Sequence, residues 1–217
     1  MNAPRRALVV IDVQNEYFAG PLEIQYPPHG ESLPMIAKAI DAANAAGIPV
    51  IAVQHSAGPG APVFDPGTDA FRLHSEVADR ARGGWKSVVK QYGSVYAQTD
   101  VAEWLRAQQV DTVTLLGYMT NNCVLASAVE GEGHGFTTEV LSDATGAIHL
   151  ANDAGFVDAK TVHTTLLTLL ASNYAAVGTT DEWVSALHAQ APLAKSDLGS
   201  SAVGGARRVA QQAARAA

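Results

Sequence analysis

Short apolar segments rich in β-branched residues alternate with longer alanine-rich segments along most of the chain. Residues 7–13 (ALVVIDV) are almost continuously apolar, which is typical of a strand buried on both faces of a sheet. Residues 48–54 form a second such segment, with Pro49 near its start, where a missing N–H is tolerated. The pattern predicts six strands, and the other four are residues 86–90, 111–116, 136–141 and 174–177.

The longer segments between these strands have helical character. Residues 33–46 are rich in alanine and are followed by Gly47, a common helix stop. The other predicted helices are residues 99–108, a helix from Asn121 or Asn122 to Glu132, residues 152–172 and residues 181–188. Strands that alternate with helices favour parallel pairing through right-handed crossovers. We therefore expect an α/β fold, a three-layer α/β/α sandwich with a mostly parallel six-stranded sheet and its site at the carboxyl ends of the strands.

Composition narrows the class of protein. The chain has 217 residues, 47% of them hydrophobic, which suits one globular domain. The count of 14 basic and 21 acidic residues gives a net charge of -7, so neither nucleic acid nor an anionic membrane is an expected partner. No apolar stretch has the length of a membrane-spanning helix. The single cysteine excludes an intrachain disulfide, and we expect a reducing, cytoplasmic location.

The chain is expected to divide into a domain of residues 1–190 and a tail of residues 191–217. The tail is rich in Ala, Gly, Ser and Arg, and from Lys195 onward it has four basic residues and one acidic residue. Two interpretations are open: the tail is disordered, or it is a helix used at a subunit contact. Two long loops, residues 20–30 and 57–67, are candidates for a functional role.

Three residues are candidates for chemistry. Asp12 interrupts an apolar strand at its carboxyl end, where a charge is costly unless it is solvated, paired or used. Cys123 follows Gly117 closely and lies in the first turn of a predicted helix, where free N–H groups favour a thiolate and could hold an oxyanion. Lys90 ends a short strand. The simpler interpretations are a capping aspartate, a buried apolar cysteine and a solvated lysine, and spacing alone does not show that the three meet.

Three segments together resemble a known family. Residues 7–17 (ALVVIDVQNEY), 88–100 (VVKQYGSVYAQTD) and 115–128 (LLGYMTNNCVLASA) are similar, in order and separation, to the signature blocks of the isochorismatase-like hydrolase superfamily. The resemblance extends from about residue 6 to residue 180. It implies that Asp12, Lys90 and Cys123 are the catalytic residues, with Asp12 as general base. It also implies a cis peptide bond between Tyr118 and Met119, and an oxyanion hole made by the N–H groups of Met119 and Cys123.

The resemblance also bears on the reaction. Members that carry the cysteine include nicotinamidase-like and other amide hydrolases, whereas true isochorismatases cleave a vinyl ether and commonly lack it. We therefore expect hydrolysis of an amide-type C–N bond of a small molecule through a thioester. Vinyl-ether hydrolysis and a non-catalytic binding protein on the same fold remain alternatives. Nicotinamidases often bind a metal through an Asp-x-His cluster, but Val53 stands where the aspartate would precede His55, so we expect no metal and no cofactor.

The remaining expected pocket residues lie near the three catalytic candidates in the sequence. Aromatic side chains among them would suit a planar substrate or an apolar acyl group, although Tyr92 and Tyr96 could instead pack a helix onto the sheet. His134, His149 and His163 are expected to be surface or packing residues. The resemblance implies that the protein forms a homodimer or homotetramer and that it has a small-molecule substrate. The substrate-binding candidates are Gln14, Tyr17, His55, Tyr92, Tyr96, Thr120 and Asn121.

Overall fold

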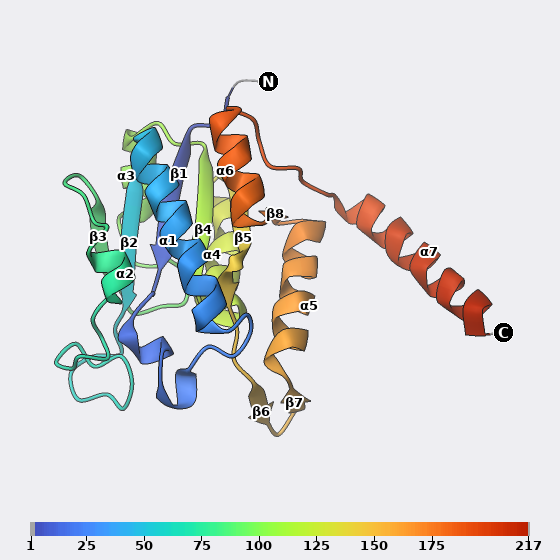
Figure 1. Ribbon diagram of the computed structural model, residues 1–217, viewed down its shortest axis with the longest axis horizontal. Helices are drawn as coiled ribbons and strands as arrows, with labels where there is room; N and C mark the ends of the chain where they lie inside the picture. Colours follow the sequence, from blue (N-terminus) through green and yellow to red (C-terminus); the bar gives the residue numbers. More distant parts are fainter. Residues whose placement is uncertain (1–2, 217) are drawn as a thin grey trace.

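A parallel six-stranded sheet forms the middle layer of the protein (Figure 1). The computed structural model describes residues 3–216. The strands follow the order β3-β2-β1-β4-β5-β8, and every neighbouring pair is parallel. The predicted α/β sandwich is confirmed, although β5 continues well beyond the predicted end of its strand. The strands are β1 (Arg6–Ile11), β2 (Val50–His55), β3 (Lys86–Lys90), β4 (Thr112–Tyr118), β5 (Thr137–Gly146) and β8 (Ala175–Gly178).

Helices cover both faces of the sheet. One face packs on α1 (His29–Ala46), α2 (Ser75–Ala78) and α6 (Thr180–His188). The other face packs on α3 (Val101–Ala107), α4 (Leu125–Gly133) and α5 (Ala159–Ser172). In β1, Leu8 points into the first core and Val9 into the second, because side chains alternate along a strand. Burial on both faces explains why β1 is apolar at almost every position.

Helix α1 begins at His29, four residues before the predicted start, so Pro34 lies inside it. A proline has helical φ but no N–H, so it removes one hydrogen bond of the helix. The first turn is held instead by the N–H groups of Glu31 and Ser32, which both donate to the carbonyl of Pro28. The helix therefore begins one turn before the start that the sequence predicted.

The predicted helix of residues 152–172 is wrong in its first part. That part forms an antiparallel hairpin of β6 (Leu150–Asn152) and β7 (Gly155–Val157), beyond the carboxyl edge of the main sheet (Figure 1). Asn152 accepts the N–H of Ala154 through Oδ1 and so stabilises the turn. Asp158 then caps α5, since its carboxylate accepts both the N–H and the hydroxyl of Thr161.

The tail beyond residue 190 ends in a helix, α7 (Leu198–Ala216), which extends away from the sandwich and is drawn in red in Figure 1. Its first residues remain attached to the domain. The carbonyl of Ala191 accepts a hydrogen bond from Arg6 at 2.6 Å, and the N–H of Leu193 donates to Glu139 at 3.3 Å. The sheet therefore holds the first residues of the tail in place, and the division of the chain at residue 190 remains a prediction. Within residues 3–216, no helix is both long and apolar enough to cross a membrane.

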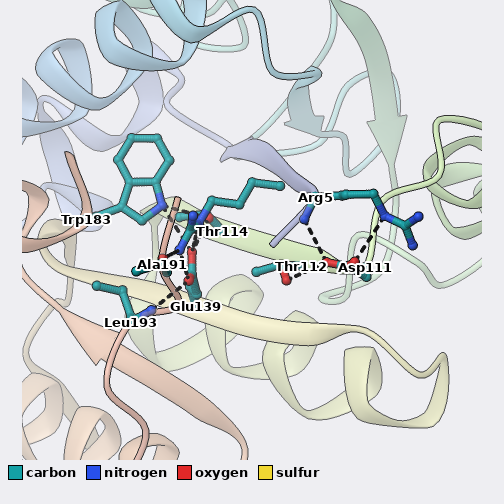
Figure 2. Close-up of polar contacts among 9 residues, drawn as sticks. Arg5, Asp111, Thr112, Thr114, Glu139, Trp183, Ala191 and Leu193 are labelled. Atoms are coloured by element: carbon teal, nitrogen blue, oxygen red, sulfur yellow. Dashed lines mark hydrogen bonds and ion pairs between the residues drawn. The ribbon is translucent and has the colours of Figure 1, made fainter. Parts of the chain in front are cut away.

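The buried ion pair of Arg6 and Glu139 anchors this segment. Figure 2 shows Glu139 between Trp183 and Leu193. Arg6 binds the carboxylate through two parallel hydrogen bonds, of 2.9 and 2.8 Å. The hydroxyl of Thr114 and the indole N–H of Trp183 donate to Oε2 at 2.8 and 3.1 Å. Both carboxylate oxygens thus have several donors, which is the condition for burying a charge without a large penalty.

Replacing Arg6 by Met is expected to destabilise the protein by about 3–5 kcal/mol, because it leaves Glu139 buried without its counter-ion. Arg5→Met provides a matched control. Arg5 pairs with Asp111 at 3.1 Å, but both side chains are largely exposed, so the loss should stay below about 1 kcal/mol. Urea unfolding measures the free energy of unfolding of both variants. Equal losses of stability would contradict the role given to the Arg6–Glu139 pair.

Candidate active site

Three strand ends bring the catalytic candidates to one edge of the sheet. Asp12 directly follows β1, Lys90 is the last residue of β3, and Cys123 lies in η3 (Thr120–Val124), a π-helical turn after β4. In a parallel sheet all carboxyl ends share one edge, which is where ligands bind in such folds. Asp12 leaves its strand with a φ of 50°, a conformation that is uncommon outside glycine and clusters at functional sites.

A close backbone approach places Asp12 beside the turn that carries Cys123. Gly117 pairs with Ile11 across β1 and β4, and its φ is 103°. A Cβ atom at this position would lie 2.0 Å from the carbonyl oxygen of Ile11. Only glycine satisfies both conditions, so this residue allows the ends of the two strands to meet.

The three candidates do converge, around the ammonium group of Lys90. Its Nζ lies 2.7 Å from Oδ2 of Asp12 and 3.2 Å from Sγ of Cys123. It also lies 3.3 Å from Nδ1 of His55 and 3.1 Å from the carbonyl oxygen of Tyr92. Asp12, Lys90 and Cys123 are at most 2% exposed, so a buried ammonium links the carboxylate to the sulfur.

The direction of the N–H bonds separates the roles of these neighbours. A lysine ammonium has three donors, and here three acceptors are aligned with it: Sγ of Cys123, Nδ1 of His55 and the carbonyl of Tyr92. Asp12 is held by charge attraction instead. Among residues 3–216, no donor is aligned with either of its carboxylate oxygens. The carboxylate therefore keeps free lone pairs next to a thiol, as a proton acceptor requires.

The sulfur rests as a neutral thiol. Burial, and then the nearby Asp12 carboxylate, raise the pKa of Cys123 to about 12, while Lys90 acts in the opposite direction. The sequence had predicted an easily ionised sulfur at a helix amino end. That expectation is wrong because the cost of burying a charge beside a carboxylate exceeds the stabilisation that the turn and Lys90 provide. A proton acceptor is therefore needed before the sulfur can attack.

His55 is fixed in one tautomer. The ammonium of Lys90 can only donate, so Nδ1 of His55 accepts and Nε2 carries the proton. Burial and the positive charge of Lys90 lower the pKa of His55, which keeps the ring neutral near pH 7. Its ring stands edge-on to Phe64, with centroids 5.0 Å apart. The sequence did not identify Phe64, although it is the one aromatic residue of the long loop 57–67.

Asp12, His55 and Cys123 each offer a metal-ligand atom, and these atoms lie within 4.8 Å of one another. However, the ammonium of Lys90 is within 3.3 Å of all three residues. It already supplies a positive charge where a metal ion would have to bind, so the residues present do not fit a resident metal. The expected absence of a catalytic metal remains a prediction.

Gln14 and Tyr17 both lie beside the site, in different roles from those expected. The amide of Gln14 donates to the carbonyls of His55 and Phe71 and accepts the N–H of His55. It therefore braces the loop instead of presenting a free amide. Tyr17 packs against Phe64 and is 1% exposed. Burial, then the charge of Asp12 and the sulfur of Cys123, raise its pKa well above 10, so it stays protonated.

The two tyrosines after Lys90, Tyr92 and Tyr96, lie in different environments. The carbonyl of Tyr92 holds the lysine, and its side chain is 48% exposed. Tyr96 was expected to bind the substrate, but its buried ring packs with His134 and Phe136, which lie near the amino end of β5. This is the alternative that the sequence left open, in which the ring packs a helix onto the sheet.

The cysteine turn is tied to α5 by a histidine that the sequence had left without a role. Nε2 of His163 is 3.0 Å from the carbonyl of Ser142 and must donate to it, so Nδ1 accepts the hydroxyl of Thr120 at 2.9 Å. Thr120 is fully buried and its hydroxyl is engaged, which makes it a support for the turn. Ser127 adds a second tie, since its hydroxyl donates to the Cys123 carbonyl and accepts the Val95 N–H.

The expected oxyanion donors lie on this turn. The peptide bond between Tyr118 and Met119 is cis, as the resemblance implies. The carbonyl of Met119 accepts the N–H groups of Asn122 and Val124, on either side of Cys123, at 3.1 Å each. In the described part of the chain, the N–H of Met119 has no acceptor. Asn121 has a buried Oδ1 that also lacks a partner there, so the turn holds free polar groups.

Comparison with known proteins then places the chain in a family. The family model of the isochorismatase domain matches residues 6–182. The chain belongs to the isochorismatase family. A crystallised isochorismatase-type protein from Burkholderia xenovorans LB400 is 44% identical, with a TM-score of 0.93 over 96% of this chain and 100% of that chain.

Two curated relatives of this isochorismatase-family protein carry the names of amide hydrolases. Ureidoacrylate amidohydrolase RutB of Stutzerimonas stutzeri is 29% identical over 67% of this chain and 71% of its own length. Maleamate amidohydrolase of Pseudomonas putida is 47% identical over 60 residues, 28% of each chain. The enzyme class predicted from the sequence, a hydrolase of carbon–nitrogen bonds other than peptide bonds, is confirmed.

The raised pKa of Cys123 predicts how the thiol reacts with iodoacetamide. At pH 7 the folded protein should label more slowly than the same chain in urea, since the thiolate is the reactive form. Asp12→Asn removes a charge that raises this pKa, so its labelling profile should move to lower pH. Lys90→Met should move the profile to higher pH. Intact mass follows labelling of the sole cysteine, and a wild-type profile below that of the urea-unfolded chain would contradict the resting thiol.

Thr120→Val should destabilise the protein by about 1–3 kcal/mol, because it leaves the acceptor Nδ1 of His163 buried and unpaired. Thr145→Val is the matched control. The hydroxyl of Thr145 is equally buried but has no partner within residues 3–216, so its loss should change stability little. Urea unfolding separates the two, and equal effects would remove the support assigned to His163.

Proposed function

We propose that the protein hydrolyses the amide-type C–N bond of a small molecule, with Cys123 as nucleophile, Asp12 as general base and acid, and Lys90 as the charge that holds them together. The observation that carries the proposal is the contact of Lys90 Nζ with both Asp12 Oδ2, at 2.7 Å, and Cys123 Sγ, at 3.2 Å. Nucleophilic catalysis by a buried thiol requires an adjacent base, and Asp12 is the carboxylate beside this sulfur.

In the first half of the reaction, the carboxylate of Asp12 takes the S–H proton while sulfur attacks the carbonyl carbon. Lys90 stabilises the developing thiolate through its aligned N–H. The C=O electron pair moves onto oxygen, and the N–H groups of Met119 and Cys123 stabilise that oxyanion. When the tetrahedral intermediate collapses, the C–N bond breaks and the leaving nitrogen takes the proton from Asp12. The products are an amine or ammonia and a thioester on Cys123.

In the second half, water replaces the amine. Asp12 takes a proton from the water as its oxygen attacks the thioester carbon, and the same N–H groups stabilise the second oxyanion. The C–S bond then breaks, the carboxylic acid leaves, and the sulfur regains its proton from Asp12. The resting arrangement of neutral thiol, carboxylate and ammonium returns, so every proton is accounted for within these residues.

The names of the relatives supply the first substrates to test. Maleamate and ureidoacrylate are small planar molecules with an acyl nitrogen, and the rings of His55 and Phe64 form an aromatic wall beside the site. We infer that a small, planar, unsaturated amide or ureido acid fits this wall. Asn121, with its unpartnered Oδ1, is the proposed acceptor for an N–H of the substrate.

An ammonia-release screen over small amides and ureido acids tests the proposal. Cys123→Ala and Asp12→Asn should each lower kcat by about 10³-fold or more, because each removes a group that acts as part of one unit. Single turnover by the wild type should add the acyl mass to the peptide that carries Cys123. Full activity of Cys123→Ala, or release of pyruvate from isochorismate without ammonia release from any amide, would overturn the reaction class.

Strand β3 carries a second lysine, Lys86, which provides a matched control for the charge of Lys90. Lys90→Met should abolish hydrolysis, whereas Lys86→Met at the other end of the strand should not, because Lys86 pairs with the exposed Asp100. Circular dichroism and urea unfolding confirm that both variants fold. If Lys86→Met lost as much activity as Lys90→Met, the effect would belong to the strand and not to the ammonium.

A further inference from the structure

Helix α7 extends away from the body of the molecule, and the neighbour that it contacts in its own chain is α5 (Figure 1). Every residue from 202 to 215 is exposed. The larger apolar side chains are among them or just before them: Leu198 is 63% exposed, Val203 52% and Val209 67%. Exposed apolar residues on a single continuous helix form a patch that monomeric proteins rarely leave open.

The helix has two distinct sides. At 100° per residue, the apolar residues all fall on one side and the polar residues all fall on the other. The apolar side holds Leu198, Ala202, Val203, Ala206, Val209, Ala210 and Ala213. The polar side holds Ser200, Ser201, Arg207, Arg208, Gln211, Gln212 and Arg215. Ala202, Ala206, Val209 and Ala213 are spaced by four, three and four residues, which is the spacing of a seam between packed helices.

The helix is too weak to persist by itself. It contains Gly199, Gly204 and Gly205, and each glycine disfavours a helix by about 1 kcal/mol relative to alanine. Isolated helices of this length are marginal in water even when their sequences are favourable, and most helical stability in proteins comes from packing an apolar face. Asp197 caps the first turn by accepting the N–H and hydroxyl of Ser200, but a cap adds only about 1 kcal/mol.

We propose that the apolar side of α7 packs on a second copy of this chain, and that two copies exchange their arms reciprocally in a symmetric dimer. Such an isologous contact buries both arms at once. The arm, residues 191–217, starts from a fixed position, because Ala191 and Leu193 are hydrogen-bonded to the buried Arg6–Glu139 pair. Residues 194–197 then lead directly into the helix.

Charge supports a copy of this chain as the partner. Residues 191–217 carry four basic residues and one acidic residue, whereas residues 1–190 carry ten basic and twenty acidic. The arm is thus at +3 and the body at -10, so each arm is attracted to the body of another copy. A lipid surface fits less well, because membrane-binding helices use Trp, Phe or Leu, and this face is mostly alanine.

The crystallised relative from Burkholderia xenovorans adds a second argument. Only 4% of this chain lies outside the match, which is less than the length of α7, so that protein carries at least part of the same arm in a similar position. The arm is therefore a feature that this chain shares with that relative.

The mass of the full-length protein in solution tests the proposal. Analytical ultracentrifugation should give a dimer or a larger even assembly for the wild type. The double variant Ala206→Glu with Val209→Glu, which places two charges on the apolar side, should be a monomer. The matched control, Gln211→Glu with Gln212→Glu, adds the same charge on the polar side and should keep the wild-type mass. Circular dichroism and urea unfolding of the body confirm that each variant is folded.

Each outcome decides the question. A monomeric wild type at tens of micromolar would overturn the proposal, and protection of α7 from hydrogen exchange in that monomer would show that the arm folds back on its own body. An unchanged mass in the apolar-side variant would show that other surfaces hold the copies together. Equal dissociation of both double variants would attribute the effect to net charge. The test needs no substrate, so it is independent of the proposed hydrolysis.

Discussion

A buried ammonium group organises this end of the molecule. Lys90 brings a carboxylate, a thiol, an imidazole and a backbone carbonyl within 3.3 Å of one charge, out of contact with solvent. A lysine in such a place is unstable unless it is paired, and pairing with Asp12 supplies the counter-charge. The parallel sheet makes this arrangement possible, because it collects the ends of β1, β3 and β4 at one edge. The need of the buried Lys90 for a counter-charge therefore also brings Asp12 and Cys123 together.

Residues 3–216 include two fully buried carboxylates that are ion-paired in different ways. Glu139 is saturated, since Arg6, Thr114, Trp183 and Leu193 all donate to it. Asp12 has a counter-ion but no aligned donor among residues 3–216. A saturated carboxylate is a structural element, because each lone pair is already in use. An unsaturated one next to a thiol retains the ability to accept a proton, so hydrogen-bond saturation separates the structural pair from the reactive one.

Much of the fold followed from the sequence, because strand burial and helix periodicity are local signals. The meeting of Asp12, Lys90 and Cys123 followed from the resemblance to the signature blocks of the family, since their spacing alone did not show it. The hairpin before α5 was not predicted, because the choice between extending a helix and capping it at Asp158 depends on a few local hydrogen bonds. The sequence left the role of Tyr96 open and did not show the hydrogen bonds of His163, because the environments of both residues are made by segments distant in the chain. The raised pKa of Cys123 depends on the burial of the sulfur itself and on the charge of Asp12, and sequence spacing reveals neither.

The single cysteine also determines how the protein meets oxidants. Peroxides react with thiolates that solvent can reach, and they convert them stepwise to sulfenic, sulfinic and sulfonic acids. Cys123 is 2% exposed and rests protonated, so the idle protein presents almost none of the reactive form. With no other cysteine in the sequence, a sulfenic acid formed here would have no intrachain thiol to resolve it. Keeping the proton on sulfur until substrate arrives thus protects a group whose overoxidation could not be reversed from within the chain.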